Sequence, residues 1–239
     1  MKTSLGFSSL VSLFVSFIYP YCLAHCGSFL LTTQSKIKAI VFDLGGVYFA
    51  DGTAEALKKF EKILHVSKDE LDNFFGGRCY GRDYRLGKIG VKEFWKAVRE
   101  QLNLESTMIR TLEEIWHSSY TRNWGMKTLV RTLRKHYKVA VLSDNTRERV
   151  EYLNKKYRLD KEFDCYVYSF EYGLLKPDSR LLEILLEKLQ AGKDEVIVID
   201  NSEKNVESFR KGGVKAIRFR SVGQVKRELS NILEHPNLI

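Results

Sequence analysis

The sequence predicts an α/β protein in which a parallel sheet forms the core and an α-helical cap is inserted into it. Short apolar runs rich in β-branched residues recur along the chain and, after residue 126, alternate with segments of helical periodicity. Such alternation is typical of a parallel sheet with helices on both faces. Between Thr53 and Tyr120 no strand pattern occurs and the periodicity is helical. We therefore expect the cap between the first and second core strands.

Five strands are expected in the core. The first, Ala39–Phe42, is an apolar run that reads as buried. The pair Gly45-Gly46 follows it closely and requires an abrupt change of backbone direction. The later strands are expected at Lys138–Leu142, Cys165–Tyr168, Glu195–Ile199 and Ala216–Phe219.

The cap is expected to contain four helices. The first covers Thr53–His65, and the second begins with a capping box at Ser67 and runs toward Phe75. The other two are expected at Val91–Leu102 and Thr107–Tyr120, and the glycine-rich segment from Gly76 to Lys88 is interpreted as a loop. The core helices are expected at Met126–His136, Thr146–Tyr157, Ser179–Gln190, Glu203–Lys211 and Val222–Leu233.

Four polar residues lie at places where such a sheet holds its ligands. Asp43 follows the first strand, Ser143 follows the second, and Asp200 follows the run Val196–Ile199. Lys176 lies in the segment Gly-Leu-Leu-Lys-Pro-Asp, residues 173–178. Open α/β sheets bind ligands at the carboxyl ends of their strands. These four segments, in this order, resemble the motifs of the haloacid dehalogenase-like (HAD) superfamily of hydrolases, and the resemblance covers residues 38 to about 235.

The resemblance implies a Rossmann-like core, residues 37–51 and 122–239, with a helical cap, residues 52–121. It also assigns roles to the four motifs. Asp43 is the expected nucleophile, which forms an aspartyl-phosphate. Ser143 and the backbone N–H of Asp144 are expected to bind a phosphoryl oxygen. Lys176 is the expected catalytic lysine, which pairs with Asp43 and with the phosphate.

The same resemblance implies a Mg²⁺ cofactor. In the family, the ion is held by the nucleophilic Asp, by the backbone carbonyl two residues later and by the Asp of the fourth motif. These positions correspond to Asp43, Gly45 and Asp200. Mg²⁺ prefers oxygen ligands and retains several waters, which suits this small donor set.

Three residues depart from the family pattern. The family's phosphatases usually carry a second Asp, the general acid/base, where this chain has Gly45. Branches with Gly there are similar to sugar-phosphate phosphatases and to the N-terminal domain of soluble epoxide hydrolases. Asp144 stands where Asn is common, and we expect its side chain to cap the helix beginning near Thr146. Asn201 replaces the second Asp of the fourth motif and can still hold a metal-bound water by a hydrogen bond.

The cap is expected to select the substrate. Arg82 and Arg85 lie in the segment from Gly76 to Lys88, which is rich in glycine, arginine and tyrosine. Guanidinium groups bind planar anions well. A solvated loop between helices is an equally open interpretation of this segment.

Three functions remain open from the sequence. The leading one is a Mg²⁺-dependent phosphomonoesterase that acts on a small phosphorylated metabolite. A haloacid dehalogenase also uses an Asp nucleophile, but it needs no metal and normally lacks an acid at the position of Asp200. A non-enzymatic binding protein on the same scaffold is motivated by Gly45, Asp144 and Asn201. The oligomeric state is not predicted.

The charge and cysteine content of the sequence limit the kinds of partner and compartment that we expect. The net charge of +9 is spread along the chain without a continuous basic stripe. We therefore expect affinity for anionic substrates and no nucleic-acid partner. The four cysteines form no metal-ligand array, and Cys79 and Cys165 are expected to be free, in agreement with a cytoplasmic protein.

Residues 1–36 form an apolar extension without Asp, Glu, Lys or Arg from Thr3 to Ser35. The extension is long enough to span a bilayer and also has features of a signal peptide. A start codon chosen too far upstream is a third interpretation. Membrane contact is expected only if residues 1–34 serve as an anchor.

Overall fold

The computed structural model of the chain describes residues 37–233. The three interpretations of the extension, residues 1–36, concern residues outside this range. Within residues 37–233, no helix combines the length and the apolar character that crossing a membrane requires. Cys79 and Cys165 are free, as predicted.

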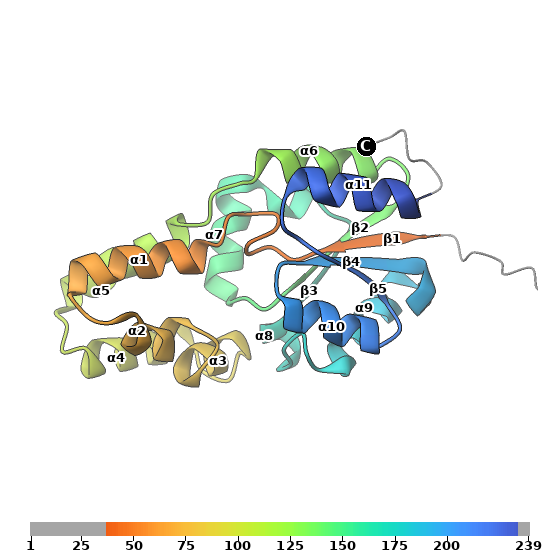
Figure 1. The fold of residues 1–239 in the computed structure, drawn as a ribbon. Helices are drawn as coiled ribbons and strands as arrows, with labels where there is room; N and C mark the ends of the chain where they lie inside the picture. Colours follow the sequence, from red (N-terminus) through yellow and green to blue (C-terminus); the bar gives the residue numbers. More distant parts are fainter. Residues whose placement is uncertain (1–36, 234–239) are drawn as a thin grey trace, which may run out of the picture. The chain divides into compact units, whose positions relative to one another are not determined.

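The core is a five-stranded parallel sheet with the order β3-β2-β1-β4-β5 (Figure 1). The strands are β1 (Ala39–Phe42), β2 (Lys138–Ser143), β3 (Cys165–Tyr168), β4 (Val196–Asp200) and β5 (Lys215–Arg218). In the register of the sheet, Phe42 lies opposite Val141 on β2 and Ile199 on β4. The residues that follow these three positions therefore meet at one edge of the sheet. The chain order reverses between β1 and β4, which is where open sheets of this kind form a ligand crevice.

Helices cover both faces of the sheet, which confirms the predicted fold class. Helices α6 (Trp124–Leu133), α7 (Arg147–Tyr157) and α11 (Val222–Ile232) pack on one face, together with Ile40 and Phe42. Helices α9 (Ser179–Leu189) and α10 (Glu203–Lys211) pack on the other, together with Ala39 and Val41. All four β1 side chains are fully buried. A short helix α8 (Ser169–Tyr172) follows β3, and 3₁₀ turns cover Leu159–Lys161 and Lys193–Glu195.

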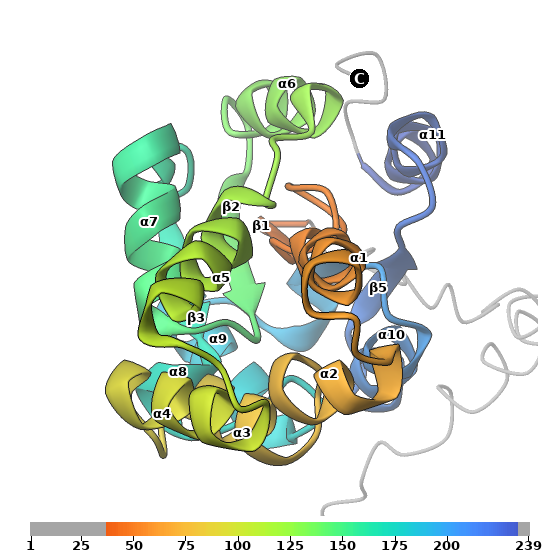
Figure 2. The same cartoon turned by 90° about the vertical axis from the view of Figure 1, so that its left-hand side faces the viewer.

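Five of the six helices between β1 and β2 group together as an insertion (Figure 2). They are α1 (Gly52–Leu64), α2 (Lys68–Phe75), α3 (Cys79–Arg85), α4 (Val91–Gln101) and α5 (Ser106–Ser118). Their buried aromatic side chains, which include Phe60, Phe75, Phe94 and Trp116, form one apolar cluster. The capping box predicted at Ser67 is present, with Glu70 as its partner. We call α1–α5 the helical insertion.

Two expectations for the helical insertion are wrong. The segment predicted as a loop contains helix α3. Its glycine at position 81 obscured the helix, and Gly81 is required because a Cβ there would overlap the carbonyl oxygen of Phe74. Helix α5 also ends at Ser118, so Tyr120 lies outside the helix in the connection back to the core.

The two connections between the core and the helical insertion run side by side. The N–H of Ala50 donates to the carbonyl of Thr121 at 2.8 Å, and the N–H of Asn123 donates to the carbonyl of Tyr48 at 3.1 Å. Farther out, the Tyr84 hydroxyl on α3 donates to Glu148 on α7 at 2.6 Å. The helical insertion is thus joined to the core at its connections and also through α3.

Candidate active site

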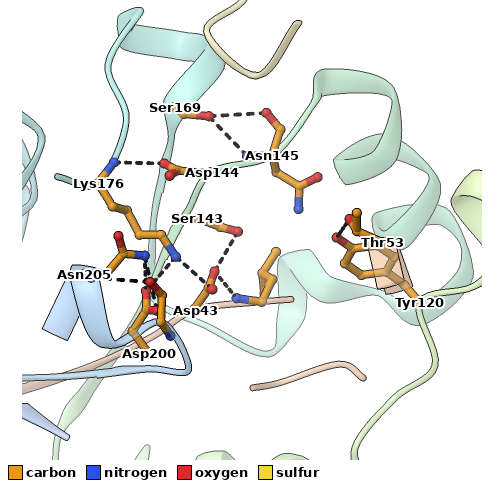
Figure 3. A network of polar contacts seen from close by, with 12 residues as sticks. Asp43, Thr53, Tyr120, Ser143, Asp144, Asn145, Ser169, Lys176, Asp200 and Asn205 are labelled. Carbon is orange, nitrogen blue, oxygen red and sulfur yellow. Dashed lines mark hydrogen bonds and ion pairs between the residues drawn. The ribbon is translucent and has the colours of Figure 1, made fainter. Parts of the chain in front are cut away.

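Asp43 is the centre of a network of polar contacts at the carboxyl ends of β1, β2 and β4 (Figure 3). Its Oδ1 accepts hydrogen bonds from the backbone N–H of Leu44 at 2.7 Å and from the Ser143 hydroxyl at 3.0 Å. Its Oδ2 lies 2.8 Å from Nζ of Lys176. Both oxygens are thus oriented by donors. The residue as a whole is 7% exposed.

Lys176 joins the two carboxylates of the site. Its Nζ also lies 2.6 Å from Oδ2 of Asp200, and the Asp200 residue is only 1% exposed. Asn205 on α10 donates to both Asp200 oxygens at 3.2 Å, and the N–H of Ser202 donates to Oδ1 at 2.8 Å. The structure therefore brings together Asp43, Ser143, Lys176 and Asp200, all of which were chosen from the sequence.

Gly46 explains how the chain turns after Asp43. Its φ is +75°, in the left-handed region that favours glycine. A Cβ at this position would also overlap the side-chain amide of Asn201. The Asn201 side chain therefore packs against the Gly46 backbone, and the turn after β1 and the turn after β4 fit each other only because residue 46 has no side chain.

Burial controls the ionisation of these groups. It raises the pKa of Asp43 to about 6; the charge of Lys176 opposes this shift and that of Asp200 adds to it. Burial alone would lower the pKa of Lys176, but the charges of Asp43 and Asp200 raise it above its usual range. Lys176 is therefore a permanent cation in this site. The excess of carboxylates over ammonium groups means that the site can accommodate further positive charge.

Asp144 does not act as the predicted helix cap. Its Oδ1 instead accepts the backbone N–H of Lys176 at 3.0 Å. The N-cap residue of α7 is Thr146, and its side chain makes no capping hydrogen bond. The Thr146 N–H donates to Oδ1 of Asn145. Asp144 therefore joins the end of β2 to the loop before α9.

A cavity of about 200 Å³ opens beside Asp43. It is lined by Asp43, Gly45, Asp51, Thr53, Arg85, Tyr120, Ser143, Asp144, Lys176 and Asn205. A second cavity of about 520 Å³, beneath α1 and α2, shares Asp51, Thr53 and Arg85 with it. The helical insertion thus contributes to the walls of the site and extends it outward.

The structure separates the two arginines chosen from the sequence. Arg85 lines the cavity, and its guanidinium donates to the carbonyl oxygens of Phe75, at 2.7 Å, and of Gly76. Arg82, one turn earlier on α3, is exposed and does not line either cavity. Helix α3 directs the two side chains differently, which a loop assignment does not reveal.

Sequence reasoning missed Asn205, Thr53 and Tyr120. Asn205 lies one turn into α10 behind Asp200, and a polar residue on the buried side of that helix was a usable signal. Thr53 and Tyr120 are 67 positions apart, yet their hydroxyl oxygens lie 3.2 Å apart. No local pattern connects them, because the fold alone brings the two connections together.

The arrangement can attack an electrophile with a carboxylate. Asp43 supplies an oxygen nucleophile, while the Ser143 hydroxyl and the Lys176 ammonium can bind an anionic group that replaces their present contacts. Lys176 would offset the charge repulsion between a carboxylate and a phosphate ester.

Comparison with known protein families agrees with this geometry. The family model described as haloacid dehalogenase-like hydrolase matches residues 40–219. An uncharacterised protein from Dictyostelium discoideum is 26% identical over 175 residues, which cover 71% of this chain and 75% of that protein. A phosphorylated carbohydrates phosphatase from Thermotoga maritima is 26% identical over 192 residues, 76% of this chain and 84% of that enzyme.

A solved structure shares the fold. It is a HAD-family enzyme from Bacteroides thetaiotaomicron, crystallised with magnesium and inorganic phosphate, and it superposes with a TM-score of 0.67 at 22% identity. The match covers 77% of this chain and 94% of that one. At this identity, the likeness concerns the fold.

Proposed function

Because the chain belongs to the haloacid dehalogenase-like hydrolases, we propose that it is a Mg²⁺-dependent phosphomonoesterase that acts on a small phosphorylated metabolite. One observation carries the proposal: Nζ of Lys176 lies within 2.8 Å of Asp43 and 2.6 Å of Asp200. The carboxylate proposed as the nucleophile and a fixed cation thereby line one small cavity, and a second carboxylate is buried against the cation. The phosphatase from Thermotoga maritima, similar over three quarters of this chain, supports the same reaction class.

In the proposed reaction, a phosphate ester enters the cavity beside Asp43. Its oxygens take the hydrogen bonds of Ser143 and Lys176. An Asp43 oxygen attacks the phosphorus, the bond from phosphorus to the ester oxygen breaks, and the alcohol leaves an aspartyl-phosphate behind once its oxygen has taken a proton. Water then attacks the phosphorus, the bond to Asp43 breaks, and inorganic phosphate leaves. The neighbouring cavity beneath α1 and α2 would hold the alcohol part of the substrate, with Arg85 at the boundary of the two spaces.

The donor set of the site suits Mg²⁺. Asp43, Asp200 and the backbone carbonyl of Gly45 would hold the ion and leave the remaining positions to water. Among residues 37–233 no group of three or more His, Cys, Asp or Glu side chains is placed to hold a metal ion. The single ammonium of Lys176 faces both Asp43 and Asp200, so this carboxylate pair can take further positive charge. Bound Mg²⁺ would supply that charge and stabilise the phosphoryl oxygens in the transition state.

Phosphate and chloride release from the full chain test the proposal. We expect p-nitrophenyl phosphate to be hydrolysed with Mg²⁺ and not with EDTA, and 2-chloropropionate to release no chloride. Asp43→Asn should abolish phosphate release, whereas Asp160→Asn, an exposed Asp beside Arg158 and Lys161, should leave it unchanged.

Two other outcomes contradict the proposal. Metal-independent chloride release would identify a dehalogenase. Release of neither product, with a folded protein, would identify a binding protein without this activity.

A further inference from the structure

The site lacks a side chain where a proton donor is expected. Residue 45, two positions after Asp43, is glycine and cannot donate a proton through a side chain. An alkoxide leaving group must therefore receive its proton from another group. A Cβ added to Gly45 would point at Tyr120, 3.2 Å from its hydroxyl oxygen and 3.5 Å from Cε1. The Tyr120 phenol therefore occupies the space that a longer side chain at position 45 would enter.

Tyr120 is held rigidly in this place. Its ring lies against the backbone of Gly52, where any Cβ would overlap it. The guanidinium of Arg149, on α7, lies 4.5 Å from the centroid of the Tyr120 ring. The Phe49 ring packs edge-on against Tyr120, with 6.2 Å between the ring centroids. The residue is only 5% exposed, yet it lines the cavity beside Asp43. The Tyr120 side chain fits here because residues 45 and 52 are both glycine and have no Cβ.

The hydrogen bonds of the Tyr120 hydroxyl allow an arrangement in which its proton is available, because either hydroxyl of the Thr53–Tyr120 pair can donate. Nη1 of Arg149 donates to it at 3.1 Å, and the Thr53 hydroxyl lies 3.2 Å away (Figure 3). A phenol has one proton and two lone pairs. When Arg149 and Thr53 both donate, the two lone pairs are used and the proton can point at a ligand in the cavity.

Arg149 has no carboxylate partner among residues 37–233. Its guanidinium is fully buried, contacts the carbonyl of Trp116 at 3.3 Å and stacks on the Trp116 ring at 3.7 Å. Burial lowers the pKa of Arg149 to about 10. A buried cation without a counter-charge is costly, and that cost falls when a neighbouring group becomes an anion. The group that Arg149 contacts in the cavity wall is the Tyr120 hydroxyl.

We propose that Tyr120 donates the proton to the leaving-group oxygen, in the role that a carboxylate at position 45 would otherwise take. This inference rests on the proposed phosphatase function. As an Asp43 oxygen bonds to phosphorus, the bond from phosphorus to the alcohol oxygen breaks and that oxygen takes the Tyr120 proton. Arg149 stabilises the phenolate. In the second step the phenolate accepts a proton from the attacking water, whose oxygen bonds to phosphorus as the Asp43–phosphorus bond breaks.

The test compares phosphate monoesters whose alcohols range from p-nitrophenol to glycerol. Nitrophenolate leaves without a proton, whereas an alkoxide does not. In Tyr120→Phe, we expect kcat for glycerol phosphate to fall by ~10²–10⁴-fold and kcat for p-nitrophenyl phosphate to change far less. The matched control Tyr152→Phe, on the outer part of α7, should behave as wild type with both esters.

A rescue variant separates the chemical role from a structural one. Removing the Tyr120 hydroxyl also removes the atom nearest to a Cβ at position 45. Gly45→Asp in the Tyr120→Phe background should therefore restore much of the activity toward glycerol phosphate. If Tyr120→Phe does not fold, Thr53→Val keeps both Tyr120 and Arg149 and should lower turnover of glycerol phosphate relative to p-nitrophenyl phosphate.

The outcomes distinguish the two proposals. A wild-type enzyme that hydrolyses neither ester overturns the phosphatase function and this inference with it. A wild-type enzyme active on both esters, with a Tyr120→Phe variant that loses both equally or neither, overturns the role of Tyr120 alone. In Thr53→Val, an unchanged ratio between the two esters would have the same meaning.

Discussion

The backbone N–H of Lys176 donates a 3.0 Å hydrogen bond to the carboxylate of Asp144. This bond ties the loop before α9 to the end of β2 and so positions the lysine whose ammonium group joins Asp43 and Asp200. An acidic residue that departs from the family pattern thus supports the proposed catalytic lysine through the backbone.

Asp144 should therefore act as a positioning residue. Asp144→Asn keeps an oxygen that can accept the Lys176 N–H, so its kcat should stay near that of wild type. Asp144→Ala loses the acceptor, and kcat should fall about tenfold, the equivalent of one hydrogen bond of ~1.5 kcal/mol. Steady-state assays of both variants check this. Equal losses in the two would show that the charge of Asp144 matters and not its hydrogen bond.

Asn205 should control metal affinity. It donates to both oxygens of Asp200, a proposed Mg²⁺ ligand. Residues that orient metal ligands typically contribute ~10–100-fold to affinity, so Asn205→Ala should raise the half-saturating Mg²⁺ concentration by that factor. With saturating Mg²⁺, kcat should recover. Asn231→Ala on the exposed side of α11 is the control. An Asn205→Ala variant with unchanged Mg²⁺ dependence would remove Asp200 from the ligand set.

Gly46 should tolerate no side chain. Gly46→Ala would force a Cβ into the Asn201 amide at a backbone φ of +75° and should destabilise the fold by roughly 1–3 kcal/mol. Gly77→Ala is a matched control, because a Cβ there meets nothing within 4 Å. Urea denaturation of the two variants measures the difference. Equal midpoints would mean that the turn after β1 relaxes easily.

His117 should make stability depend on pH. Burial, and to a lesser extent the charge of Arg149, lowers its pKa in the folded protein from 6.5 to about 4. The unfolded chain then binds the proton more readily between these values, so the stabilising contribution is present above pH 6.5 and is lost as pH falls toward 4. The full change is about 3 kcal/mol. His117→Phe, which keeps a ring to stack on Tyr152, should lose less stability than wild type over this range. Urea midpoints at pH 7 and pH 4.5 provide the measurement, and parallel losses in both proteins would contradict it.

The sheet and its four polar positions could be predicted because each depends on local sequence. An apolar run such as Val196–Ile199 identifies a strand, and the residue after it necessarily falls at the carboxyl edge. The common edge then follows from parallel pairing, so Asp43, Ser143 and Asp200 could be placed together without knowledge of the cap.

The parts that were missed depend on contacts between distant segments. Helix α3 was obscured by Gly81, which is there because another backbone passes close to it. Tyr120 was assigned to a helix that ends two residues earlier, and its position in the cavity depends on room left by glycines more than 65 positions away. Asp144 was expected to bond to its own helix, whereas its partner lies 32 residues later. Such pairings leave no periodic signal.

The two strands of chain that enter and leave the helical insertion are hydrogen-bonded neighbours, at Ala50 and Thr121. The insertion has its own apolar core, and away from these two connections it also contacts the core through α3, where the Tyr84 hydroxyl donates to Glu148. If other helices replaced those between Thr53 and Ser119 and restored the contacts with α7, then Asp43, Ser143, Lys176 and Asp200 would stay with the sheet. Gly52 and Tyr120, which lie beside the two connections, would stay as well. We therefore expect substrate choice to change with the insertion, whereas the proposed nucleophile and proton donor would be kept together.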